Sequence, residues 1–109
     1  MIILVTSEIS ENDLARAAED LDGYVKVVVD IQKGILTAGG ERHVDGEQLL
    51  IQSGSLQQNL WGGGIDLETM GIDYDSMINL RPGQNNPSRE VLSPDLRKTM
   101  DEIIRRLLR

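Results

Sequence analysis

The sequence predicts an α+β fold, a mostly antiparallel sheet with amphipathic N- and C-terminal helices packed on it. Apolar residues alternate with period two along residues 24–31, which indicates a strand. The short turn that follows contains Gly34 and favours an antiparallel hairpin. Near the C-terminus, large apolar residues recur with the period of an amphipathic helix. A length of 109 residues fits one domain, so we expect residues 1–109 to form a single domain.

The first half of the chain predicts a strand, a helix and a hairpin. Residues 2–5 are a short apolar run typical of a buried strand. Ser10 is expected to cap the helix that follows, and Gly23 to end it in the left-handed conformation. Residues 24–31 and 35–38 are the expected strands of the hairpin.

The second half is less regular. Residues 45–53 fit either a strand or a short helix, and we interpret them as a helix capped by Asp45 and ended by Gly54. Residues 60–67 and 72–80 are expected strands. Ser93 as N-cap and Pro94 as first helical residue should begin the last helix. Its apolar stripe comprises Leu96, Met100, Ile103, Ile104, Leu107 and Leu108.

Composition excludes several functional classes. A net charge of -7 disfavours a nucleic-acid surface, because phosphate binding draws on Lys and Arg. The absence of cysteine excludes disulfides and thiolate chemistry. No apolar run approaches the length of a membrane span or a signal peptide, so we expect a cytoplasmic protein with no membrane partner.

Two features concern partners. The chain has no Phe, one Trp and two Tyr, so its core must be mainly aliphatic and we expect a homodimer interface to add burial. Residues 81–109 hold 7 basic and 4 acidic side chains, whereas the rest of the chain is strongly acidic. A small anionic ligand is therefore expected late in the chain.

The only histidine lies in a polar, glycine-rich segment. His43 and Glu47 share a face in either a strand or a helix, and Asp45 lies between them. An imidazole beside carboxylates suits acid–base work. One His without a second imidazole or a thiolate is a poor metal-binding set, however, and Asp45 is already explained as a cap. We expect no metal and no cofactor, and assign no catalytic residue.

Trp61 is followed by three glycines that lack the spacing of a phosphate-binding loop. We interpret these glycines as sites of close backbone approach or a bulge, and Trp61 as part of the core. An exposed Trp61 would instead anchor a partner.

Arg81 and Arg89 flank a loop that contains Asn86 and Ser88. Two guanidiniums with amide and hydroxyl donors would suit a carboxylate or a phosphate. The alternative, which we favour, is that the arginines pair with acidic side chains and the asparagines bond their own turn. No Gly-x-Ser-x-Gly motif is present, which disfavours a serine hydrolase.

Several short motifs occur along the chain: His43-Val44-Asp45, Gly54-Ser55, Leu60-Trp61-Gly62 and Ile78-Asn79-Leu80-Arg81-Pro82, followed by the closing helix. Their combination in this order resembles a family of small prokaryotic proteins known only as a domain of unknown function. The resemblance covers residues 24–109 and implies no activity. The chain reads Asn85-Asn86-Pro87-Ser88 where the resemblance would lead us to expect a Gly-Asn-Arg-Ser-like loop.

The biochemical function is unknown from the sequence, and two hypotheses follow. The leading one is a non-enzymatic binding or regulatory module. The alternative is a small hydrolase or ligand-processing enzyme, with His43 as acid–base and an Arg81/Arg89 anion clamp. A shared pocket for these three residues would favour the enzyme. The face of the binding module would combine His43, Trp61, Asn79, Arg81 and Arg89.

Overall fold

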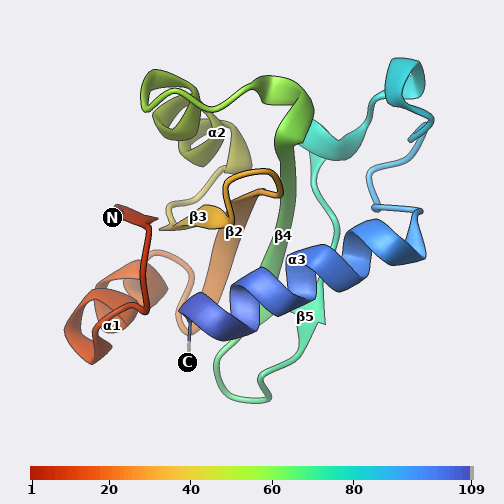
Figure 1. Ribbon diagram of the computed structural model, residues 1–109. Coiled ribbons are helices and arrows are strands. Elements are labelled where there is room, and N and C mark those ends of the chain that lie inside the picture. The colour runs from red at the N-terminus through yellow and green to blue at the C-terminus, as the bar shows by residue number, and fades with distance from the viewer. Residues whose placement is uncertain (109) are drawn as a thin grey trace.

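The computed structural model describes residues 1–108, which form a five-stranded antiparallel sheet and three α-helices (Figure 1). The strand order is β1-β3-β2-β4-β5, and each neighbouring pair is antiparallel. The α+β class, the antiparallel sheet and the C-terminal helix are therefore confirmed. The strands are β1 (Ile2–Val5), β2 (Tyr24–Asp30), β3 (Ile35–Gly39), β4 (Leu60–Asp66) and β5 (Ile72–Asp73), and the helices are α1 (Glu11–Glu19), α2 (His43–Gln52) and α3 (Pro94–Leu107).

The sheet has a large apolar core on one face and a small one on the other. Val27 of β2 belongs to the large cluster with Ile104 of α3, which passes in front of the sheet in Figure 1. Val28, the next residue, belongs to the small cluster with Leu50 of α2. Because successive side chains of a strand point to opposite faces, β2 supplies both cores. No helix within residues 1–108 has the length and apolarity needed to cross a bilayer.

The predicted serine N-caps are confirmed. The Ser10 hydroxyl accepts from the Asp13 amide at 3.1 Å. Gly23 has the predicted positive φ, 93°, but it does not end α1, because the helix ends at Glu19 with Asp20 as C-cap. Ser93 caps α3 by accepting from the Leu96 amide at 3.2 Å. These contacts satisfy backbone groups that a helix end leaves free. The predicted stripe of α3 is buried except for Leu96, which is partly buried.

Residues 45–52 are helical as predicted and Ser53 is the C-cap, but the predicted N-cap is wrong. Helix α2 begins at His43, and Arg42 occupies the N-cap position without a side-chain cap bond. Asp45 lies in the first helical turn, where its carboxylate pairs with Arg42 at 3.1 Å. A carboxylate is favourable anywhere in the first turn of a helix. Asp45 therefore indicated that a helix begins nearby but did not identify its first residue.

The predicted strand over residues 72–80 is wrong beyond Asp73. Ser76 starts a 3-10 turn, Met77–Asn79, by accepting from the Ile78 amide at 3.3 Å. The Asn79 side chain then returns to the edge of β4, where Oδ1 accepts from the Gly62 amide at 2.8 Å and Nδ2 donates to the Gly62 carbonyl at 2.9 Å. This amide makes the two bonds that a residue of a neighbouring strand would make. A side chain thus replaces the expected strand.

Candidate functional site

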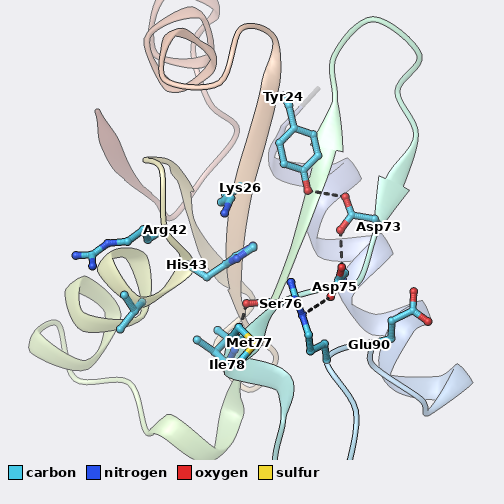
Figure 2. Close-up of a pocket in the computed structure, with 12 residues that line it drawn as sticks. Tyr24, Lys26, Arg42, His43, Asp73, Asp75, Ser76, Met77, Ile78 and Glu90 are labelled. Atoms are coloured by element: carbon cyan, nitrogen blue, oxygen red, sulfur yellow. Dashed lines mark hydrogen bonds and ion pairs between the residues drawn. The ribbon is translucent and has the colours of Figure 1, made fainter.

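A pocket of about 640 Å³ lies between β2, the start of α2 and the segment that follows β5 (Figure 2). This volume is within the usual range for small-molecule sites. Its rim includes the exposed apolar side chains Val44 and Met77. The pocket is lined by Tyr24, Lys26, Arg42, His43, Val44, Asp73, Asp75, Ser76, Met77, Ile78, Arg89 and Glu90.

Two glycines of β4 let side chains lie close against the sheet beside this pocket. A Cβ at Gly62 would lie 2.8 Å from the Ser76 Oγ and 3.1 Å from the His43 Cδ2. A Cβ at Gly64 would overlap the Tyr24 hydroxyl. The prediction that the glycines after Trp61 mark close approach is therefore confirmed.

His43 presents one free nitrogen. Its Nε2 donates to the Gly63 carbonyl at 2.7 Å, so the neutral ring carries its lone pair on Nδ1. Nδ1 has no hydrogen-bond partner within residues 1–108. It is also open to solvent, because the one fully buried side-chain nitrogen or oxygen without a hydrogen bond in these residues is Glu47 Oε2. Burial lowers the pKa of His43, which keeps the ring neutral at pH 7. His43 can therefore accept a hydrogen bond from a ligand.

Most charges at the pocket are already paired. Arg42 pairs with Asp45 at 3.1 Å, Arg89 with Asp75 at 3.3 Å, and Glu90 with Arg97 at 3.7 Å. Within residues 1–108 no ion pair involves Lys26 or Asp73, although both line the pocket.

The Asp73 carboxylate is held in place by neutral donors. It accepts from the Tyr24 hydroxyl at 2.5 Å and from the Asp75 amide at 3.2 Å. Desolvation and the nearby Asp73 raise the pKa of Tyr24, so the phenol remains a donor. Each carboxylate oxygen keeps further lone pairs for a ligand.

Arg81 lies beside the pocket, mostly buried, and does not line it. Its side chain is 12% exposed, lies over the Trp61 ring at 4.6 Å, and is 3.8 Å from Glu47 Oε2. That separation allows an ion pair but exceeds a hydrogen bond. Desolvation lowers the pKa of Arg81, opposed by Glu47. Arg81 donates to the carbonyls of Ile78, Gln57 and Leu60 and to the Gln84 side chain.

Two buried asparagines hold the loop behind the pocket. Asn79 Nδ2 also donates to the carbonyls of Tyr74 and Arg89, at 3.1 Å each. Asn86 Nδ2 donates to the carbonyls of Asn79 and Glu90, at 2.8 Å and 2.9 Å. Their amides therefore fix the backbone that carries the pocket wall.

The structure brings together only part of the predicted site. His43 and Arg89 line the pocket, whereas Trp61, Arg81 and Glu47 form a buried cluster next to it. Asp45 and Glu47 engage arginines and not the imidazole. Ser88 accepts from the Glu90 amide at 3.0 Å.

Ten of the twelve lining residues were not recognised from the sequence, among them Tyr24, Lys26, Asp73 and Asp75. All four lie in segments expected to be strands. The available signal was Lys26, the one charged side chain inside a run of valines. Residues 1–108 contain no group of three or more His, Asp or Glu side chains placed to hold a metal ion.

Comparison with known proteins gives a family without an activity. No curated protein and no solved structure matches the chain. Residues 3–107 match the family described as "Protein of unknown function (DUF5674)", a longer stretch than the resemblance over residues 24–109. Because the match spans nearly the whole chain, this protein belongs to the DUF5674 family.

Proposed function

We propose that the protein is a non-enzymatic binding or regulatory module, and that its ligand is a small molecule with an anionic group held in the pocket between β2, α2 and residues 73–90. The observation that carries this proposal is that Lys26 lies at the pocket without a counter-ion. This partly buried residue lines the pocket and has no ion-pair partner within residues 1–108. An ammonium group without a counter-ion is available for a charge-assisted hydrogen bond to an anion.

The pocket walls support a preformed binding site. Asn79 and Asn86 fix the loop because their side-chain amides donate hydrogen bonds to backbone carbonyls. Arg81 ties that loop to β4 by donating to Leu60 and to the adjoining Gln57. A site whose walls are held before binding loses less entropy when the ligand arrives.

The enzyme alternative has one observation in its favour, the free Nδ1 of the neutral His43. A general base also needs a nucleophile or an orienting carboxylate within reach. Here the orienting contact is the Gly63 carbonyl, and Ser76 Oγ accepts from the Ile78 amide. We therefore favour binding over catalysis.

Thermal unfolding with sodium acetate and with inorganic phosphate, at matched ionic strength, tests the proposal. An anion at ten times its Kd should stabilise the wild type by about 1.4 kcal/mol. Lys26→Met should lose that response. Lys98→Met, which removes an exposed lysine of α3 outside the pocket, should keep it. Equal responses of both variants to both anions would contradict the proposal.

We also propose that the protein acts as a single-domain homodimer in the cytoplasm of a prokaryotic cell. The absence of cysteine suits a reducing compartment. Strand β1 has a partner on one side only, and its Leu4 is exposed, so a second copy can add to this edge. Sedimentation should show concentration-dependent association at micromolar protein. A monomer at every concentration would exclude the dimer.

A further inference from the structure

The pocket contains one unpaired charge of each sign. Arg42, Arg89 and Glu90 are neutralised by neighbouring residues of opposite charge. Lys26 and Asp73 are left, and no ion pair within 4.0 Å joins them to each other or to another described residue. The pocket thus has one cation and one anion that no counter-ion within the described residues neutralises.

The two charges lie on two strands of the sheet, one on each side of β4. Lys26 projects from β2 and Asp73 ends β5, and both are paired in register with Gly64 of β4 (Figure 2). Tyr24 holds the Asp73 carboxylate through a neutral hydrogen bond, so the position of the charge is fixed although the charge itself is not cancelled. Such a carboxylate is a ready acceptor for an ammonium group.

The other exposed groups are a hydrogen-bond acceptor and an apolar rim. The His43 Nδ1 is free. Val44 and Met77 offer exposed apolar surface at the rim. A ligand that meets all of these groups has an anionic end, a cationic end and an apolar side chain.

Resting on the proposed function, we propose that the ligand is amphoteric: an α-amino acid or a short peptide whose carboxylate pairs with Lys26 and whose ammonium pairs with Asp73. An apolar side chain lies against Val44 and Met77. The free amino acid and the peptide share this chemistry and differ in the distance between the two charged ends.

Titration calorimetry on the full chain tests the inference with four probes: leucine, dileucine, leucine amide and N-acetyl-leucine. Leucine amide keeps the ammonium only, and N-acetyl-leucine keeps the carboxylate only. Leucine or dileucine should bind at least about tenfold more tightly than either blocked compound, because each blocked compound leaves one charge unpaired. The tighter of these two ligands identifies the free amino acid or the peptide.

Two variants assign the ends of the ligand. Asp73→Asn can still accept from Tyr24, and should weaken leucine and leucine amide but not N-acetyl-leucine. Lys26→Met should weaken leucine and N-acetyl-leucine but not leucine amide. Lys98→Met and Glu102→Gln, exposed sites on α3, should change none of these affinities.

Two results would overturn the inference. N-acetyl-leucine binding as tightly as leucine would show a site for the anion alone. No binding of any probe would exclude an amphoteric ligand, and the acetate and phosphate series would then show whether the anion site itself fails. The comparison of the four probes on the wild type remains decisive if a variant does not fold.

Discussion

Replacement of Arg81 by alanine should be among the most destabilising single substitutions in this chain. Arg81 is 12% exposed and its partner Glu47 is 6% exposed, with Oε2 lacking any hydrogen bond. Removal of the guanidinium strands this carboxylate in a buried position. It also leaves carbonyls of Leu60 and Ile78 without a donor and uncovers one face of Trp61. Breaking a buried pair from one side typically costs about 3–5 kcal/mol, and we expect Arg81→Ala to fall in that range.

Urea unfolding followed by far-UV circular dichroism measures this cost without depending on the fluorescence of Trp61. Arg42→Ala is the matched control, because Arg42 is 72% exposed and its pair with Asp45 should contribute at most about 1 kcal/mol. In a Glu47→Gln background the cost of Arg81→Ala should fall by about 1–3 kcal/mol, since no charge is then stranded. Equal costs for Arg81→Ala and Arg42→Ala would refute the account of the buried cluster.

Three further predictions concern the pocket walls and are measured by the same unfolding assay. Asn79→Ala should lower the free energy of unfolding by about 2–4 kcal/mol, because both backbone groups of Gly62 lose their hydrogen-bond partner. A loss no larger than that of a surface substitution would contradict this role of the Asn79 side chain. Gly64→Ala should cost about 1–3 kcal/mol because the methyl group meets the Tyr24 hydroxyl, whereas Gly83→Ala, with nothing within 4 Å, should be close to neutral. Burial lowers the pKa of His43 in the folded chain. As the pH falls below 6.5, the imidazole is therefore protonated in the unfolded chain before it is protonated in the folded chain. The wild type should then lose up to about 1.4 kcal/mol per pH unit relative to His43→Gln until the folded-state pKa is reached, and parallel pH profiles would contradict this.

The regular elements were predictable because their signals are local. The Val alternation gave β2, the turn at Gly34 gave the hairpin, and Ser93 with Pro94 gave the start of α3. Each of these features depends on a few consecutive residues. The strand predicted over residues 72–80 failed because the Asn79 side chain, and not its backbone, occupies the edge of β4. Nothing in the local pattern distinguishes these two uses of an asparagine.

The candidate site was predictable only in part, for a related reason. His43 and Arg89 were noticed as polar residues in irregular segments, where function often lies. Lys26 and Asp73 belong to strands. They are candidate binding residues because neither forms an ion pair with another described residue. That property depends on the whole fold. Arg81 was a candidate for ligand binding, but the favoured interpretation was that it pairs with an acidic side chain. The structure agrees with that interpretation, because Arg81 lies 3.8 Å from Glu47 Oε2 and donates to backbone carbonyls of the protein.

The central claim is that the pocket binds a ligand through Lys26, and nuclear magnetic resonance of the full chain tests it most directly. Titration with acetate and then with leucine, followed by side-chain signals of Lys26, Asp73 and His43, locates the bound molecule. The account predicts saturable shifts for Lys26 with both compounds, and for Asp73 and His43 with leucine. Saturable shifts confined to another part of the surface, with the Lys26 signals unchanged by both compounds, would contradict it.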